Sequence, residues 1–277
     1  MNPDWIEINN LLCEYHKLGI PQLHDYNKFY MYSIIAHSTA IEGSTLTELE
    51  TQILLDDGLT AKGKPLEHHL MSVDLKSAYE FAFEQASKKQ DITPKFLCQL
   101  NANVMKTTGA EHNHITGSWD SSKGEYRLCG VTAGFSGSSY MHFKKIPNAV
   151  DELCKELNSL ISSRLDKYRA YETSFIAHQK LVTIHPWIDG NGRTSRLLMN
   201  YIQYSHNLIP SKVFMEDKKE YIESLQKSRE LENPIPFLKF MRQQLHKTLK
   251  TEIQEFKKAQ KKIDISSKRK IDFGLNF

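Results

Sequence analysis

Helical hydrophobic spacing recurs along most of this chain, and it constrains the fold more than any other feature. In segment 25–43, DYNKFYMYSIIAHSTAIEG, apolar side chains recur at Phe29, Tyr32 and Ile35. Segments 44–58, 63–90 and 93–108 have helical length and carry helix-forming signals. Because a helix turns once in about 3.6 residues, such spacing gives a helix one apolar stripe. The sequence therefore predicts an all-α fold.

Residues typical of helix ends delimit these segments. Thr47 and Glu50 stand at capping-box spacing, and Gly58 closes the same segment as a C-terminal cap. Thr93 followed by Pro94 is typical of an N-cap and a first helical residue. Helical patterns resume in segments 148–165, 171–186, 192–206 and 217–231, and in a last helix that ends near residue 262. The remaining tail, ISSKRKIDFGLNF, is expected to be frayed.

One stretch departs from this regularity, between residues 109 and 141, where Gly, Ser and Thr are frequent. Within it and just beyond, YRLCGV (126–131), GFSGSS (134–139) and YMHF (140–143) are typical of a strand, a turn and a second strand. The sequence therefore predicts a helical bundle with a single small β-hairpin, at about residues 124–143.

Composition is that of an ordinary globular protein. The chain has 277 residues, 40% of them hydrophobic and 25% charged, and its formal net charge of +3 is too mild to argue for nucleic acid or membrane. No apolar run is long enough to cross a bilayer, and the first ten residues lack the features of a signal peptide, so we expect a cytoplasmic location. The cysteines, at positions 13, 98, 129 and 154, are unpaired in sequence and are expected to be reduced thiols.

The stretch IHPWIDGNGRTSRLLMN, residues 184–200, concentrates chemistry-bearing residues between two predicted helices. Pro186 should end the first helix, and the second begins near Arg193. Gly190 and Gly192 can adopt backbone conformations closed to other residues, so successive N–H groups can point into one concavity. A helix N-terminus adds unsatisfied N–H donors and a positive dipole end. These features together predict a phosphate site.

Charged residues extend this prediction. Arg193 and Arg196 lie three apart on one helix face, which suits a polyphosphate better than a single anion. Asp189 is the acid of the cluster, and beside polyphosphate it is suited to holding Mg²⁺. His185 ends the preceding helix and can serve as a base that takes a proton from a hydroxyl. Each feature alone is also found in proteins without such a site, as a surface loop or a solvated arginine. The combination of these residues in this order favours a functional phosphate site.

HPWIDGNGRTSR also resembles the active-site motif of Fic-domain proteins, His-x-Phe-x-[Asp/Glu]-Gly-Asn-Gly-Arg-x-x-Arg. The specified positions are filled except that Trp187 stands where the motif has Phe. The resemblance implies a Fic-type helical fold that transfers AMP from ATP to a hydroxyl of a target protein. A related branch that transfers phosphate carries Ala and Lys where Gly190 and Gly192 stand here.

The resemblance also implies a role for each motif residue. His185 would deprotonate the target hydroxyl, and Asp189 would hold the Mg²⁺ that bridges the phosphates. The anion hole would be formed by Gly190, Asn191 and Gly192. Arg193 and Arg196 would hold the outer phosphates, with Arg196 nearest the γ-phosphate.

Two further segments match features of the family. Gly124, Glu125, Tyr126 and Arg127 match a flap motif, Gly-x-Tyr-Arg, whose backbone pairs with an extended segment of the target. A plain surface hairpin is the alternative. Ser38, Glu42 and Gly43 match the motif [Ser/Thr]-x-x-x-Glu-[Gly/Asn] of an inhibitory helix, here at about residues 28–43.

In the family, that glutamate binds the arginine that would otherwise hold the γ-phosphate, because a carboxylate competes directly with phosphate for the guanidinium. The corresponding residues here are Glu42 and Arg196. The alternative is a helix that happens to end at Gly43 with Glu42 in solvent. The chain is thus identified as resembling the class with an N-terminal inhibitory helix.

The resemblance predicts a division into 1–90, with the inhibitory helix, 91–210, the Fic core, and 211–277, the C-terminal helices and tail. It implies a target protein with a Ser, Thr or Tyr hydroxyl, which can be this protein itself, and it allows a homodimer. No membrane and no specific nucleic acid are expected as partners. Two alternatives stay open: another donor, such as UTP, GTP or a phosphocholine-bearing nucleotide, and a nucleotide-binding regulatory module without turnover.

Overall fold

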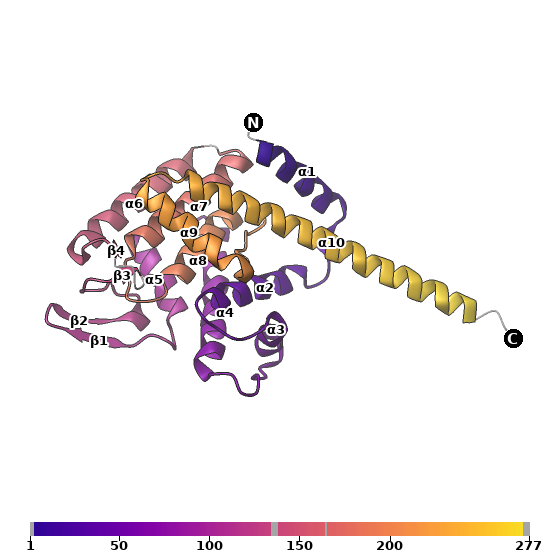
Figure 1. The fold of residues 1–277 in the computed structure, drawn as a ribbon, viewed down its shortest axis with the longest axis horizontal. Helices are drawn as coiled ribbons and strands as arrows, with labels where there is room; N and C mark the ends of the chain where they lie inside the picture. Colours follow the sequence, from indigo (N-terminus) through magenta and orange to yellow (C-terminus); the bar gives the residue numbers. More distant parts are fainter. Residues whose placement is uncertain (1–2, 134–137, 164, 274–277) are drawn as a thin grey trace. The chain divides into compact units, whose positions relative to one another are not determined.

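The protein is described by a computed structural model that covers residues 3–133, 138–163 and 165–273 (Figure 1). These residues form ten α-helices: α1 Pro3–Lys17, α2 Tyr26–Ile41, α3 Glu48–Asp57, α4 Leu66–Ser87, α5 Pro94–Val104, α6 Ile146–Ser162, α7 Lys167–Ile184, α8 Asn191–Ser205, α9 Lys218–Glu230 and α10 Ile235–Phe273. The strands are β1 Glu111–His114, β2 Gly117–Asp120, β3 Thr132–Ala133 and β4 Ser138–Ser139. The prediction of an all-α fold with a small hairpin is confirmed.

Local sequence explains the helix ends. The Thr47 side chain accepts a hydrogen bond from the Glu50 amide at 3.2 Å, and the Glu50 carboxylate accepts one from the Thr47 amide at 2.8 Å. This reciprocal pair is the predicted capping box. Gly58 ends α3 with φ 71°, and the Thr93 hydroxyl accepts from the Phe96 amide at 3.1 Å to begin α5.

The chain divides into two compact units, Met1–Lys28 with Arg242–Phe277, and Phe29–Met241. In the first unit, α1 is tied to the C-terminal part of α10. Arg242 Nε lies 3.1 Å from Asp4 Oδ2, and Lys257 Nζ lies 2.5 Å from Glu14 Oε1. Buried apolar side chains accompany these ion pairs, at Ile8, Leu12, Tyr15, Leu249 and Ile253.

In the second unit, α8 is the central helix. It packs against α7, α4 and α5, and nearly all its residues from Asn191 to Gln203 are buried (Figure 1). The sequence explains this burial, because Leu197, Leu198 and Ile202 form the predicted apolar stripe. The motif at the start of α8 is therefore held by the most enclosed helix of this unit.

The predicted hairpin is shorter than expected, and a second one accompanies it. β3 and β4 pair antiparallel, with Thr132 opposite Ser139, and the predicted turn residues 134–137 lie outside the described part of the chain. Residues 126–131 do not pair as a β-strand with the second predicted strand, because the Arg127 amide donates to the Pro186 carbonyl at 3.1 Å instead. β1 and β2 also pair antiparallel. Their polar sequence, EHNHITGSWD, conceals the apolar alternation that would have predicted a hairpin.

The last helix is longer than predicted. α10 continues to Phe273 rather than ending near residue 262. Residues 237–273 contain neither Gly nor Pro, so no residue of that stretch imposes a stop. Across the described residues, no helix is both long and apolar enough to span a bilayer.

Candidate functional site

The loop between α7 and α8 carries the predicted site residues in a strained, enclosed conformation. His185 ends α7 with φ 54°, a left-handed conformation that non-glycine residues rarely adopt. Gly190 opens α8 with φ 77°. A Cβ at Gly190 would lie 2.7 Å from Asn101 Nδ2 and 2.9 Å from Met105 Sδ, so a side chain fits neither the space nor the backbone angle.

Asn191 and Trp187 hold this loop from within. Asn191 Oδ1 accepts from the Trp187 amide at 3.1 Å, and Asn191 Nδ2 donates to the Trp187 carbonyl at 2.8 Å. Trp187 is fully buried, and its indole N–H donates to the Gly124 carbonyl at 2.9 Å. The Asn191 side chain is thus committed to the loop, and only its backbone N–H remains for a phosphate.

Most of the residues predicted to form the target-docking flap face inward. Arg127 is completely buried and donates to the His185 carbonyl at 2.9 Å, to Cys129 at 2.5 Å and to Met141 at 2.6 Å. Gly124 lies so close to the Cys98 carbonyl that a Cβ would overlap it. Arg127 therefore ties both ends of the β3–β4 hairpin to the backbone of His185.

The two other flap residues differ from each other. Tyr126 is half-buried, whereas Glu125 is exposed. The Glu125 carboxylate accepts a hydrogen bond from the Asp120 amide at 2.7 Å. Among the four predicted docking residues, Glu125 is therefore the one that is exposed.

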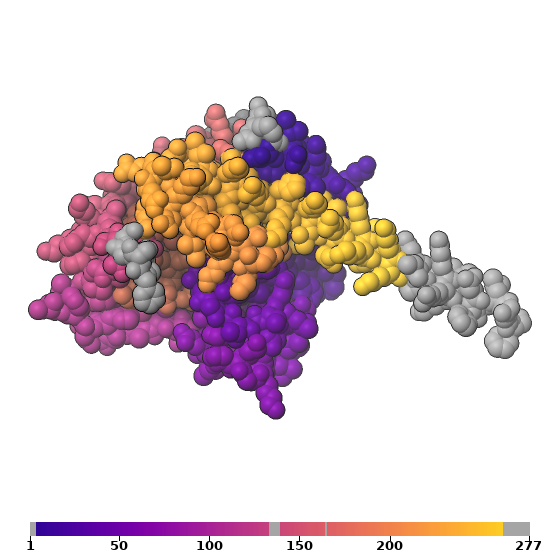
Figure 2. Space-filling model, in the orientation of Figure 1, coloured from indigo at the N-terminus to yellow at the C-terminus, as the bar shows by residue number. Residues whose placement is uncertain are grey.

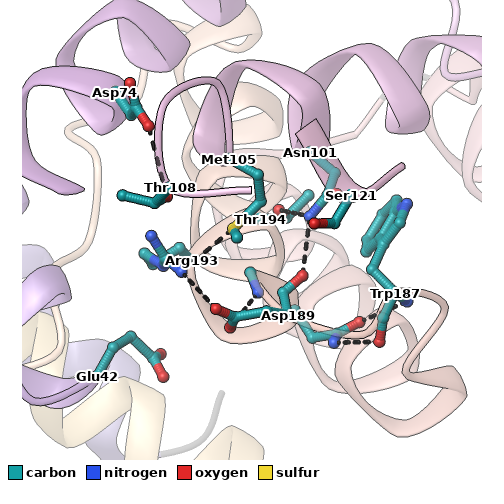
Figure 3. A network of polar contacts seen from close by, with 12 residues as sticks. Glu42, Asp74, Asn101, Met105, Thr108, Ser121, Trp187, Asp189, Arg193 and Thr194 are labelled. Atoms are coloured by element: carbon teal, nitrogen blue, oxygen red, sulfur yellow. Dashed lines mark hydrogen bonds and ion pairs between the residues drawn. The ribbon is translucent and has the colours of Figure 1, made fainter. Parts of the chain in front are cut away.

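Arg193 is a buried cation with few partners. It is 2% exposed, and among the described residues its Nε and Nη1 have no hydrogen-bond partner. Its Nη2 lies 3.3 Å from Met105 Sδ and 3.4 Å from Asp189 Oδ2, and the Asp189 side chain is 65% exposed (Figure 3). Buried charges are normally paired, so this arrangement favours the binding of an additional anion.

Arg196, in contrast, has partners on every nitrogen, most of them at the end of α2 or directly after it. Its Nε donates to Ser38 Oγ at 2.8 Å, and its Nη2 donates to the Ser38 carbonyl at 3.0 Å and to Glu42 Oε1 at 2.6 Å. A Cβ on Gly192 would overlap that same Glu42 oxygen, so the carboxylate lies directly over the glycine nest. Figure 3 shows Glu42 pointing from α2 toward the loop that carries Asp189. Gly43 follows with φ 107°, which a side chain would disfavour.

Tyr221, His178 and Asn101 support the site but were missed in the sequence. Arg196 Nη1 donates to the Tyr221 hydroxyl at 3.2 Å, and that hydroxyl lies 3.0 Å from His178 Nε2. Burial, and then the charge of Arg196, hold the pKa of His178 well below its usual range, so its neutral ring can accept a hydrogen bond from the Tyr221 hydroxyl. Asn101 Nδ2 donates to the Thr194 hydroxyl at 3.1 Å.

These three residues could be found only in part from sequence. His178 shares a helix face with His185, which the helical spacing indicates. Tyr221 lies 25 residues from Arg196, in a helix whose sequence carries no distinguishing signal. Asn101 likewise lies in a predicted helix, and no local sequence signal distinguishes it.

His185 is suited to accepting a proton. Burial lowers its pKa from 6.5 to about 4, so the imidazole is neutral at pH 7. The ring of Tyr140 stacks on it, with centroids 3.8 Å apart and planes 15° apart. A cavity of about 540 Å³ adjoins this pair. It is lined by Gly192, by apolar residues of α2, α7 and α9, and by the polar residues Glu42, Tyr140, Thr183, His185, Lys218, Tyr221, Gln226 and Arg229.

A neutral histidine and a glycine nest beside one cavity, with two buried arginines on the helix that starts at the nest, are typical of a site for the phosphates of a nucleotide. Comparison with known proteins agrees. Residues 91–203 match the model of the Fic/DOC family. Residues 91–203 are therefore assigned to a Fic domain.

Similar proteins include the Protein adenylyltransferase Fic of Drosophila persimilis, which is 32% identical over 221 residues, or 78% of this chain and 39% of that protein. The chain spans about two fifths of the length of the curated relatives it matches.

Solved structures share the fold. A Fic-domain-containing signaling protein from Bacteroides thetaiotaomicron has a TM-score of 0.74 at 22% identity, covering 91% of this chain and 98% of that one. The structure of IbpAFic2 in complex with adenylylated Cdc42 has a TM-score of 0.53 at 15% identity, covering 88% of this chain and 70% of that one.

Proposed function

We propose that this protein transfers AMP from ATP to a hydroxyl side chain of a target protein. The target oxygen attacks the α-phosphorus of ATP and forms the new P–O bond. The bond from the α-phosphorus to the oxygen that bridges to the β-phosphate breaks, and pyrophosphate leaves. His185 takes the hydroxyl proton. The Drosophila relative, a protein adenylyltransferase, and the complex of IbpAFic2 with adenylylated Cdc42 support this reaction class.

One observation carries the proposal: a neutral His185 adjoins the same cavity as Gly192 and the carboxylate held by Arg196. A carboxylate over a glycine nest has the charge and hydrogen-bonding pattern of a phosphate oxygen pair. Arg193 supplies two more buried N–H donors that have no partner within the described part of the chain. An anion-binding surface next to a base is what phosphoryl chemistry on a hydroxyl requires.

The donor set fits Mg²⁺ as well. The Asp189 side chain is exposed. Its Oδ1 accepts a hydrogen bond from the Gly190 amide at 2.5 Å, and its Oδ2 makes a long contact with Arg193. Lone pairs of both oxygens therefore remain for a hard cation. Mg²⁺ would offset part of the negative charge of the phosphates when bound. Asp189 would hold it, while the backbone N–H groups of Gly190, Asn191 and Gly192 and the arginines would bind the phosphates.

The proposal includes inhibition by Glu42. The γ-phosphate of ATP and the Glu42 carboxylate would compete for Arg196, and both would need the space over Gly192. A charge-assisted pair at 2.6 Å between groups 3% and 32% exposed is stronger than a solvated surface pair. ATP would therefore bind unproductively until Glu42 leaves.

Several parts of the prediction remain proposals of the same kind. They are the choice of Ser, Thr or Tyr as the acceptor, self-modification, a homodimer, a cytoplasmic location, the flap as the surface that docks the target, and the three-part division at residues 90 and 210. The expected absence of membrane and nucleic-acid partners likewise stays a prediction.

Incubation with α-labelled ATP and Mg²⁺ tests the proposal directly. We would compare the unchanged protein, Glu42→Gly, and Glu42→Gly combined with His185→Ala. The Glu42→Gly protein should label itself or an added protein lysate at least ten-fold faster, and the His185→Ala change should abolish the label. Ser38→Ala serves as a graded control, because it removes one bond to Arg196 and leaves Glu42, and it should activate less.

Each unexpected result of the labelling experiment would contradict a different part of the proposal. Equal labelling with and without Glu42 would remove the inhibitory role and keep the transferase. Labelling from UTP or GTP, and not from ATP, would show that the protein uses a different nucleotide donor. ATP binding without label in any variant and with any donor would favour a nucleotide-binding regulatory module.

A further inference from the structure

Tyr140 joins three elements around the imidazole of His185. It follows β4 directly, and its amide donates to the Val131 carbonyl at 3.1 Å, so it continues the pairing of the hairpin. One face of its ring stacks on His185 at 3.8 Å. The guanidinium carbon of Arg229, on α9, lies 5.2 Å from the centre of the same ring. The tyrosine ring thus lies against a histidine and an arginine from two other elements.

We propose that Tyr140 is a positioning residue for the catalytic step, because its ring fixes the plane of the His185 imidazole and shields one face from water. The proposal rests on the proposed function only in taking His185 as the base. Tyr140 itself would not exchange a proton with substrate.

The geometry of the stack suits this role. The lone pair of a neutral imidazole nitrogen lies in the plane of the ring, so a partner stacked 15° from parallel covers the face and leaves the edge open. Proton transfer takes place at that edge. A ring that packed edge-on would compete with the target hydroxyl, whereas the observed stack does not.

His185 lies where the helix has already ended, so packing from other elements contributes to its orientation. It is the C-cap that follows α7, in a left-handed conformation, with Pro186 after it. Orientation matters greatly for general-base catalysis, where a displacement of about 1 Å can lower the rate about a hundred-fold. The cation–π contact from Arg229 holds the Tyr140 ring in place in turn.

The effect of Tyr140 on the imidazole charge depends on several groups. Burial is the largest influence on the pKa of His185 and disfavours its charged form; the Val182 backbone opposes it, Arg127 acts in the same direction as burial, and Asp189 and Glu42 oppose it. The π face of Tyr140 would by itself attract an imidazolium. Arg229 already makes a cation–π contact with that ring and would repel a second cation, so we expect shielding from water to dominate.

Titration of His185 by NMR, with labelled histidine and His185→Ala for assignment, tests the proposal without any activity. Tyr140→Ala should raise the pKa of His185 by about one unit, toward the ordinary value of 6.5. Tyr140→Phe keeps the stacked ring and should leave it within a few tenths. An unchanged pKa in Tyr140→Ala, or a Phe variant that behaves like the Ala variant, would overturn the proposal.

Labelling rates in the Glu42→Gly background give a second readout. Tyr140→Ala should lower kcat ten- to a hundred-fold with little change in the KM for ATP, and Tyr140→Phe should retain most of the rate. A loss confined to KM would contradict positioning. If Glu42→Gly itself gives no label, the proposed function fails, and the NMR titration still decides the role of the stack.

Tyr204→Ala is the matched control. Tyr204 is 40% exposed and stacks on Phe83, with ring centroids 4.2 Å apart, and it does not line the cavity. Removal of this stacked tyrosine should lower stability without changing either the His185 titration or kcat. Equal effects of Tyr204→Ala and Tyr140→Ala would show a general loss of stability and would overturn the proposal.

Discussion

Arg196 is the residue on which polar contacts from several elements converge. Ser38 and Glu42 approach it from α2, and Tyr221 approaches it from α9. Each guanidinium nitrogen has a partner, and Nη2 donates to both the Ser38 carbonyl and Glu42. The loss of Glu42 would therefore remove one of the two partners of Nη2. Tyr221 and Ser38 would continue to hold the side chain where a γ-phosphate could reach it.

We therefore expect Tyr221→Phe to weaken ATP binding rather than catalysis. The change removes the acceptor of Arg196 Nη1 and the partner of His178 Nε2. In the Glu42→Gly background, the KM for ATP should rise about three- to ten-fold with kcat nearly constant, and stability should fall by about 1 kcal/mol. Steady-state kinetics and urea unfolding measure both effects. A fall in kcat at constant KM would contradict this role.

His185 should give the reaction an unusual pH profile. Its pKa of about 4 keeps the base neutral across the physiological range. The labelling rate of Glu42→Gly at saturating ATP should therefore stay level between pH 8 and pH 6, where an ordinary histidine would lose half its activity near pH 6.5. Initial rates across that range test this expectation, and a midpoint near 6.5 would refute it.

The same pKa affects stability. A histidine whose folded pKa is lowered favours the folded state less as pH falls from 6.5 to 4, because only the unfolded chain takes up the proton. His185 should therefore cost at most about 3 kcal/mol of stability at pH 4 relative to pH 7. His185→Ala should flatten this part of the pH dependence in urea unfolding.

At the scale of elements, α2 is fastened to the segment that precedes α9. On the face shown in Figure 2, the orange surface around residues 210–230 borders the purple surface of residues 29–90. Three hydrogen bonds join α2 to this segment: Tyr30 hydroxyl to Pro210 carbonyl at 2.6 Å, Lys212 Nζ to Ser33 Oγ at 3.0 Å, and Met215 amide to His37 Nδ1 at 3.1 Å. These contacts lie between about one and a half and three and a half turns before Glu42 and fix its approach to Arg196.

Lys212→Met should therefore relieve inhibition in part. Lys212 is buried, and besides Ser33 it lies over the rings of Tyr30 and Phe214 at 5.2 and 5.1 Å. With Glu42 present, we expect basal labelling to rise about two- to five-fold, since about 1 kcal/mol of anchoring is lost. The same change in Glu42→Gly should give no further activation. Activation of equal size in both backgrounds would contradict an effect through α2.

For the whole molecule, the division into two units predicts that they lose structure separately. The unit of α1 and the C-terminal part of α10 contains ion pairs and a small apolar set that includes Ile8, which is completely buried. Small cores of this kind open at lower free energy than larger ones.

Ile8→Ala should remove about 2–4 kcal/mol from the smaller unit alone. In hydrogen-exchange mass spectrometry, peptides of α1 and of α10 beyond residue 242 should lose protection. Peptides of α7 and α8 should keep it, and ATP labelling by Glu42→Gly should be unchanged. Equal loss of protection in α8 would show that the two units unfold as one.

Periodicity and capping residues determined most of the helical fold from sequence. Thr47, Gly58 and Thr93 act through neighbours in the chain, so their structural effects can be predicted locally. The motif at residues 185–196 was equally visible, because its glycines, charges and helix start lie within one loop and one helix turn. The length of the strands was not predictable, since the contact of Arg127 with Pro186 crosses 59 residues of sequence.

Tertiary structure alone decided which groups surround the motif. The carboxylate over Gly192 comes from α2, the ring on His185 comes from the hairpin, and the hydroxyl on Arg196 comes from α9. Such contacts depend on how helices pack, which one-dimensional periodicity does not encode. The same holds for the pKa of His185, because its cause is burial by distant segments. The sequence by itself determined the chemistry that is available, and the packing decided its geometry.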